Sequence, residues 1–248
     1  MKKFSVAAAQ SGSVKGNISE NISAHLNFID AASEHNVDII IFPELSLTGY
    51  EPEIAKENML EGSENILNPF IDSANKKNIT IIAGAPICSE YDKPYIGAFI
   101  IHPSKQITVY RKRYLHKGEE LFFVPSQDNL VFRLKDESIG MAICADIDNP
   151  AHPLDAKKCG ATIYAASVLM SVNGIDDAYN KFSSYAKQYK MLAVMANYAI
   201  NTGGFITAGK SGIWNENGNL IASAEGTETT LVIAEKDDNS WNGRKIKM

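Results

Sequence analysis

The sequence predicts an α/β fold, a layered sandwich in which helices cover mixed β-sheets. Two patterns support this prediction: apolar strand-like runs alternate with amphipathic segments in the first part of the chain, and hairpin signals occur in the middle and at the end. A chain of 248 residues, 45% hydrophobic and 21% charged, can bury a full core. Folds of this class and length often form one domain, so we expect a single domain over residues 1–248.

In the first half of the chain, helix signals separate the apolar runs. Asn17 followed by Glu20 has the spacing of a capping box, and the apolar residues from Ile22 to Ala32 recur every three or four positions, as on one face of a helix. Ser63 is the expected cap of a second helix. The expected strands of this half are residues 4–10, 37–42, 79–83, 95–102 and 106–110, the last two forming a hairpin.

The second half contains fewer helix signals and more short strands. One helix is expected from Pro150 to Cys159, ended by Gly160, and another over residues 176–189. Asn217-Gly218 is a strong hairpin turn signal. The expected strands are residues 130–134, 138–143, 161–166, 192–197, 205–208, 212–214, 220–224 and 231–234.

Composition argues against several classes of function. The net charge is −5 and the lysines are scattered, so no basic stripe indicates nucleic acid or an anionic membrane as a partner. The start lacks the apolar segment of a signal peptide, and no run is long enough to span a membrane. Three widely spaced cysteines form no disulfide framework, and five histidines show no paired metal-ligand spacing. We therefore expect a reduced, cytoplasmic protein without a metal site.

Residues 204–211, GFITAGKS, match the P-loop expression, but their surroundings do not fit a phosphate site. A P-loop follows a strand and opens directly into a helix whose N-terminus receives the phosphate. Here the following residues 212–218 indicate a strand and then a turn, and Phe, Ile, Thr and Ala in the middle of the match favour a strand. Nucleotide hydrolysis is therefore not the predicted function.

Cys144 directly follows the strand-like run 138–143 in the stretch SIGMAICAD, residues 138–146. It is the candidate nucleophile. A single cysteine is more often a buried, inert apolar residue, so catalysis requires partners at other strand ends. Two are available: Glu44, at the end of a buried strand in FPELSLTGY, and Lys112, after the expected hairpin in YRKRYL. Either charge alone would be assigned to a solvated surface, whereas together they indicate an active site.

With these segments the sequence resembles the nitrilase superfamily, the carbon-nitrogen hydrolases, over essentially the whole chain. The resemblance implies a four-layer α-β-β-α sandwich with mixed sheets, and places the triad of that family on Glu44, Lys112 and Cys144. It also implies a second glutamate, Glu119, with Glu120 as the nearby alternative. A homodimer and the absence of any metal or organic cofactor are further implications.

The chemistry of that family also follows from the residue types. Glu44 would accept the thiol proton, while the Lys112 ammonium would favour the thiolate and stabilise the oxyanion. Cys144 would form a thioester that water, activated by Glu44, hydrolyses, and Glu119 would hold the groups in register. We therefore expect a hydrolase that cleaves a non-peptide carbon–nitrogen bond of a small amide or N-carbamoyl compound.

The residues after the cysteine depart from the family pattern. Ala145 stands where an aromatic residue is usual, and Asp148 stands where many members have an arginine. We expect from Asp148 a preference for polar or cationic amides. The candidate substrate-binding residues are Tyr50, Ala145, Asp148 and Ser167.

Two other hypotheses remain open. A Cys-His amidase would pair Cys144 with His116 or His152, since imidazole is a common activator of thiols. The third hypothesis is a catalytically inactive binding or scaffold protein of the same fold, which the departures after Cys144 leave open.

Overall fold

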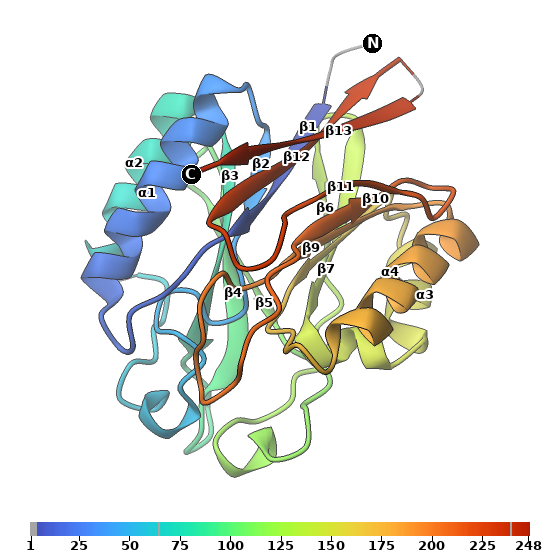
Figure 1. Ribbon diagram of the computed structural model, residues 1–248. Coiled ribbons are helices and arrows are strands. Elements are labelled where there is room, and N and C mark those ends of the chain that lie inside the picture. Colours follow the sequence, from blue (N-terminus) through green and yellow to red (C-terminus); the bar gives the residue numbers. More distant parts are fainter. Residues whose placement is uncertain (1–3, 64, 239) are drawn as a thin grey trace.

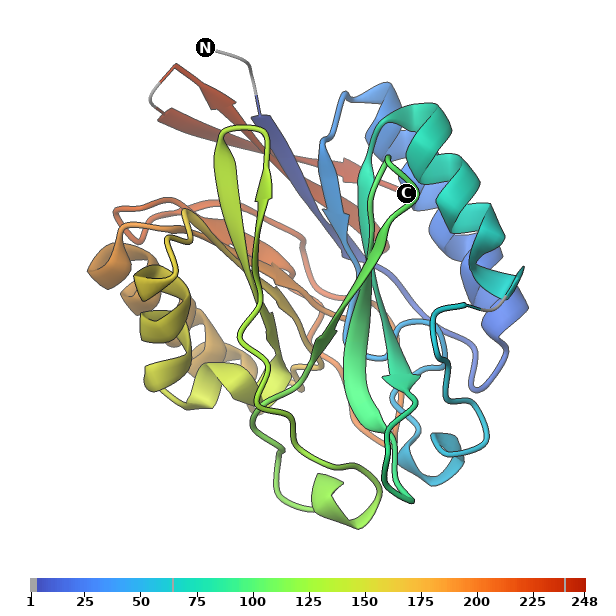
Figure 2. The same cartoon turned by 180° about the vertical axis from the view of Figure 1, so that it is seen from behind.

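The computed structural model describes residues 4–63, 65–238 and 240–248. Two β-sheets face one another, and a pair of helices covers the outer side of each (Figures 1 and 2). The four layers α-β-β-α, with parallel and antiparallel pairs in both sheets, confirm the predicted fold class.

The first sheet has parallel strands at its centre and antiparallel strands at both edges. β1 pairs in parallel with β2 and β2 with β3, and the sheet continues outward through antiparallel pairs on both sides. Its spatial order is β13 (Ser240–Lys247), β12 (Thr230–Asp237), β1 (Phe4–Gln10), β2 (Ile39–Ile41), β3 (Thr80–Ile87), β4 (Tyr95–Ile101) and β5 (Ile107–Arg111).

The second sheet follows the same plan. Its central strands β7, β8 and β9 are parallel, and hairpins extend it at either edge. Its spatial order is β11 (Leu220–Ser223), β10 (Gly212–Trp214), β9 (Leu192–Ala196), β8 (Ile163–Ser167), β7 (Glu137–Ile143) and β6 (Val131–Leu134).

The helices cover the outer faces of the sheets. Asn17 caps the first helix, where its side chain accepts a hydrogen bond from Glu20 N at 3.2 Å, as the capping box predicts. The α-helices are α1 (Ile18–Glu34), α2 (Asn68–Lys77), α3 (Ala151–Lys158) and α4 (Ile175–Tyr189). Short 3₁₀ turns are η1 (Pro52–Ile54), η2 (Asn65–Leu67), η3 (Glu119–Leu121) and η4 (Cys144–Asp148).

Alternation along the strands divides the core into three layers. In β1, Val6 and Ala8 pack between the sheets, whereas Ala7 and Ala9 pack against α1 and α2. Successive side chains of a strand point to opposite faces, so a strand covered on both sides must be apolar throughout. This is why the central strands appear as continuous apolar runs in the sequence.

Three sequence predictions about elements are wrong or incomplete. Ser63 does not cap α2, which begins at Asn68 after η2 and has Leu67 at its N-cap. Pro69, in its first turn, needs no N–H partner there. Residues 205–208 form a loop with isolated bridges, not a strand. β13 was not predicted, because its alternating charged residues are those of an exposed edge strand rather than of a buried one.

β10 follows directly after the segment that matches the P-loop expression, so this segment does not open into a helix as a P-loop does. Within the described ranges, none of the helices combines the length and the apolar character that crossing a bilayer would require.

Candidate active site

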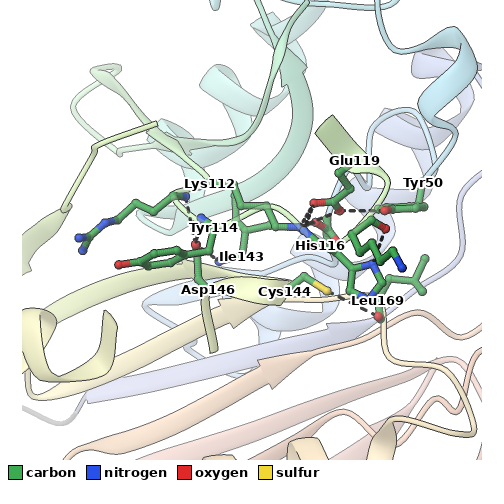
Figure 3. A network of polar contacts seen from close by, with 12 residues as sticks. Tyr50, Lys112, Tyr114, His116, Glu119, Ile143, Cys144, Asp146 and Leu169 are labelled. Carbon is green, nitrogen blue, oxygen red and sulfur yellow. Dashed lines mark hydrogen bonds and ion pairs between the residues drawn. The ribbon is translucent and has the colours of Figure 1, made fainter. Parts of the chain in front are cut away.

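The candidate site lies where strands of both sheets end. Glu44 follows β2, Lys112 follows β5 and Cys144 follows β7, so both sheets contribute to one cluster (Figure 3). A cavity of about 200 Å³ opens above it and is lined by Glu44, Cys144 and Glu119, among other residues. The structure thus brings together the four residues that the sequence predicted for the reaction.

Lys112 is the centre of the cluster. Its ammonium donates to Glu44 Oε1 at 2.7 Å and to both carboxylate oxygens of Glu119 at 2.8 and 2.9 Å. Its side chain is fully buried. Burial opposes the charged form, but Glu44, Cys144 and Glu119 together outweigh it and raise the pKa of Lys112. The ammonium therefore stays charged at every pH at which the protein would work.

Glu119, not Glu120, is the second glutamate of the cluster. In addition to Lys112, its carboxylate accepts hydrogen bonds from Tyr50 Oη at 2.8 Å and from His116 N at 2.7 Å. Burial raises the pKa of Tyr50, which keeps this hydroxyl a donor. Glu120 is exposed and accepts a bond from Gly118 N. Every oxygen lone pair of Glu119 is thus occupied, which suits an orienting role better than proton transfer.

Glu44 sits in a tight turn that β3 accommodates. A Cβ at Gly84 would lie 2.4 Å from Leu45 N, so only glycine lets the turn approach that strand. Leu45 has a φ of 53°, and Tyr198 Oη donates to the Glu44 carbonyl at 2.7 Å. Burial raises the pKa of Glu44 to about 7, although Lys112 acts in the opposite direction.

The second carboxylate oxygen of Glu44 is the available one. Oε1 accepts the bond from Lys112, whereas Oε2 is buried and has no hydrogen-bond partner among the described residues. A buried acceptor without a partner is costly and is common at functional sites. With a pKa near neutrality, Glu44 has the protonation behaviour of a general acid and base.

Cys144 occupies a strained position at the start of η4. Its φ is 43°, which is rare outside glycine and is found where function holds a backbone in place. The thiol is partly exposed to the cavity and lies 3.7 Å from Leu169 O. Burial and the neighbouring Glu44 raise the pKa of Cys144 despite the nearby Lys112. Lys112 thus acts in the predicted direction, toward the thiolate, but burial and Glu44 outweigh it, so the thiol needs a base.

The four predicted substrate-binding residues separate into two pairs. Tyr50 and Asp148 line the cavity, and Asp148 pairs with Lys181 at 2.7 Å. Ala145 and Ser167 are buried and are not among the residues that line the cavity. Ser167 is therefore not exposed to the cavity in this structure. Ala145 can contribute through its backbone, since N–H groups in the first turn of a helix lack intrahelical acceptors.

The hydrogen bonds of the two histidines in the Cys-His hypothesis go to partners other than Cys144. His116 lines the cavity, but Nδ1 lies 3.1 Å from its neighbour's carbonyl, that of Lys117. His152 is buried between Tyr110 and Tyr164, at 2.8 and 2.9 Å from their hydroxyls, and burial lowers its pKa. Across the described part of the chain, no hydrogen bond joins Cys144 to a histidine.

Several cavity residues could not be found from sequence. Leu169 and Met170 follow β8, Lys181 and Asp177 come from α4, and Phe205 comes from the loop that resembles a P-loop. The spacing of Asp177 and Lys181 indicates a helical ion pair, but not that it faces the cavity. Among the residues that the structure describes, no group of three His, Cys, Asp or Glu side chains is arranged to hold a metal ion.

Comparisons with known proteins show the family and the fold. The profile of the carbon-nitrogen hydrolase family matches residues 5–244. A nitrilase from Pyrococcus abyssi is 27% identical over 226 residues, which cover 88% of this chain and 84% of that protein. The structure of an amidase from Nesterenkonia sp. AN1 superposes with a TM-score of 0.87 at 18% identity, covering 95% of this chain and 93% of that one.

Other relatives are much longer than this chain. A glutamine-dependent NAD(+) synthetase from Acinetobacter baylyi is 26% identical over 99% of this chain, but the match covers 46% of the synthetase. The chain spans less than half the length of the first curated relatives that it matches. The family match nevertheless covers nearly the whole of the present sequence. This protein therefore belongs to the carbon-nitrogen hydrolases of the nitrilase superfamily.

Proposed function

We propose that this protein hydrolyses a small linear amide or N-carbamoyl compound through a thioester on Cys144. One observation carries the proposal: a protonated thiol and Glu44, whose Oε2 is unpaired, line one small cavity, and the charged Lys112 ammonium is hydrogen-bonded to Glu44 directly behind that lining. Nucleophile, base and oxyanion stabiliser are thereby present in the roles that acyl transfer requires. The amidase names among the relatives support the same class of reaction.

The first half of the reaction transfers the acyl group to sulfur. Glu44 accepts the thiol proton as Cys144 Sγ attacks the carbonyl carbon, and the carbonyl oxygen becomes an oxyanion. Lys112 and the N–H of Ala145 stabilise this charge. As the tetrahedral intermediate collapses, the carbon–nitrogen bond breaks, and the proton on Glu44 passes to the departing ammonia or amine. The product of this half is a thioester.

The second half releases the acid. Glu44, again ionised, accepts a proton from water as the water oxygen attacks the thioester carbonyl, and collapse expels the Cys144 sulfur. Glu119 keeps Lys112 and Glu44 aligned through both halves, because its four hydrogen bonds leave it no freedom to rotate. The same two oxyanion donors serve both tetrahedral intermediates.

Size and charge of the cavity limit the substrate. A volume of about 200 Å³ is smaller than the cavities that bind drug-sized ligands, so we propose an acyl group of a few heavy atoms. Asp148, Asp177 and Lys181 form the rim, with two carboxylates and one ammonium and hence a net charge of −1. This rim supports a polar or cationic distal group, although Asp148 is paired with Lys181 and is less free than the sequence suggested.

Intact-protein mass spectrometry tests the proposal directly. A panel of small amides and N-carbamoyl compounds is mixed with the protein, and the mass is read before turnover is complete. We expect an adduct equal to the acyl group, ammonia release in the same samples, and neither in Cys144→Ala. Cys159→Ala is the matched control, because that thiol is exposed and away from the site. Turnover that persists in Cys144→Ala would overturn the thioester.

The panel also separates the competing hypotheses. An inactive scaffold predicts neither adduct nor ammonia with any compound, whereas a Cys-His amidase predicts loss of turnover in His116→Ala and retention in Lys112→Ala. A homodimer, which the family resemblance implies, is a separate proposal, and light scattering of the purified protein measures it.

A further inference from the structure

Asp146 is a buried carboxylate that the mechanism above does not use. It lies two residues after Cys144 in η4, and its side chain is fully buried. Removing a carboxylate from water is costly unless its oxygens receive hydrogen bonds, so its surroundings should explain why it is there.

The carboxylate of Asp146 joins two chain segments. Oδ1 accepts from the backbone N–H groups of Arg113 at 3.0 Å and Tyr114 at 2.9 Å. Oδ2 accepts from Ile143 N at 2.8 Å and from Tyr110 Oη at 2.7 Å. Figure 3 shows Asp146 between these segments, below Tyr114 and beside Ile143. Both oxygens are thus fully occupied by donors.

The positions of these donors in the chain show which segments Asp146 connects. Arg113 and Tyr114 directly follow Lys112, which ends the segment from the first sheet, and Ile143 directly precedes Cys144, at the end of β7 in the second sheet. One side chain therefore connects the backbone that carries the ammonium to the backbone that carries the thiol, across the interface between the sheets.

We propose that Asp146 is a positioning residue that sets the placement of Cys144 Sγ relative to Lys112 Nζ. This inference rests on the proposed function, because the relative placement matters only if the two groups act on one substrate. The strained φ of Cys144, 43°, means that the turn would relax if nothing held it. The bond from Ile143 N to Asp146 holds the residue just before that strain.

A carboxylate is required here, and an amide would not replace it. All four contacts are made by donors, three backbone N–H groups and one hydroxyl, and an ionised carboxylate is the side chain that offers acceptors alone. In Asp146→Asn, the amide NH₂ would face at least one N–H group. That repulsion would rotate the side chain and release either the segment after Lys112 or the turn at Cys144.

Asp146→Asn is the main variant, and Asp155→Asn is its matched control. Asp155 pairs with the Arg113 guanidinium at 3.2 Å, so it belongs to the same neighbourhood but touches neither the Arg113 backbone nor Ile143. We expect kcat of Asp146→Asn to fall about 100-fold with KM changed less than about 3-fold, as for a misplacement of about 1 Å. Asp155→Asn should stay within about 3-fold of the parent protein in both parameters.

The rate and pH dependence of Cys144 alkylation by iodoacetamide distinguish positioning from a purely structural role. If Asp146 only stabilised the fold, neither should change in the folded variant. In folded Asp146→Asn, alkylation should slow and its pH dependence should shift, because Glu44 and Lys112 no longer face the thiol correctly. A folded Asp146→Asn with unchanged kcat and an unchanged alkylation profile would overturn the proposal, whatever its melting temperature. If no amide is hydrolysed by the parent protein but the alkylation shift appears, the proposed function fails and the positioning stands.

Tyr110→Phe is a milder variant that tests the same proposal if Asp146→Asn does not fold. It removes one of the four donors and leaves the carboxylate in place. We expect kcat to fall about 10-fold, the lower end of the effect of losing one hydrogen bond to a charged group. Unchanged kcat and unchanged alkylation in this variant would count against Asp146 in the same way.

Discussion

Two lysines lie near the same cavity, and each forms ion pairs with two carboxylates. Lys112 lies between Glu44 and Glu119 with side-chain exposures of 0, 0 and 2%. Lys181 lies between Asp148 and Asp177, and the three exposures are 28, 52 and 68%. The residue types are nearly the same, so the two clusters differ chiefly in their access to water.

Because of this difference, we expect the inner cluster to act in the reaction and the outer cluster to contact the substrate. In the inner cluster, burial raises the pKa of Glu44 to about 7 and leaves one of its oxygens without a partner, which prepares it to move protons. In the outer cluster, water screens each charge, and such pairs contribute about 0–1 kcal/mol each. Its charges are free to respond to whatever the substrate presents. Exposure, more than composition, decides which cluster can act in the reaction.

The largest expected effect comes from removing the inner lysine. Lys112→Met leaves Glu44 and Glu119 buried without their cation, which should lower the free energy of unfolding by about 3–5 kcal/mol. Loss of an oxyanion donor should lower kcat by a factor of about 100–1,000. Chemical denaturation and amide turnover measure the two effects.

Lys181→Met is the matched comparison for Lys112→Met. The same change in the exposed cluster should alter the free energy of unfolding by less than about 1 kcal/mol. If the two variants lost equal stability, the contrast between a buried and a solvated cluster would be wrong.

The next effect concerns pH and the inner cluster alone. Glu44 acts as a base when ionised, so kcat/KM should rise as the pH increases through about 7. The contribution of Glu44 to the free energy of unfolding should instead fall as the pH increases. Because its pKa is higher in the folded than in the unfolded protein, the folded state binds the proton more tightly, and this contribution is lost as the pH rises through the folded value.

Glu44→Gln provides the control for both pH effects. The variant should lose the rise in kcat/KM together with most of the activity, and its stability should depend less on pH in the same range. A parent protein whose kcat/KM stays flat through pH 7 would show that another group accepts the proton.

Much of the inner cluster was predictable from sequence, and little of the outer one was. Glu44, Lys112 and Cys144 each follow a strand, and strand ends of a layered fold converge, so these patterns together with the family resemblance were enough to bring them together. Asp177 and Lys181 lie on a helix whose sequence shows an ion pair but not the direction that it faces. That direction depends on how α4 packs on the second sheet.

The failures within the site have a common physical cause. Sequence predicted that Lys112 would favour the thiolate, but it could not show that the depth of the thiol and the nearness of Glu44 outweigh this effect on the pKa of Cys144, because both are properties of the packed structure. Ser167 at the end of β8 looked equivalent to other strand ends, yet its side chain is fully buried and is not among those that line the cavity. Strand ends can be predicted from sequence, whereas which of their side chains open into the cavity cannot.

The smallest expected effect is on substrate selection by the outer cluster. The probes are amides of equal chain length that end in a methyl, an ammonium or a carboxylate group. Asp148→Asn leaves the rim neutral and should lower the preference of kcat/KM for the ammonium over the methyl compound by about 3-fold to 5-fold, the effect of one partly screened charge. Lys181→Met leaves two carboxylates and should raise the same preference by a similar factor.

The carboxylate compound provides the internal control for this last prediction. Its kcat/KM relative to the methyl compound should change in the opposite direction in each variant, because the rim charge acts on it with the opposite sign. A uniform change across all three compounds would indicate altered cavity shape, and an unchanged preference in Asp148→Asn would remove the outer cluster from substrate selection. In that case the short acyl space beside Cys144 would be left to discriminate among amides by size alone.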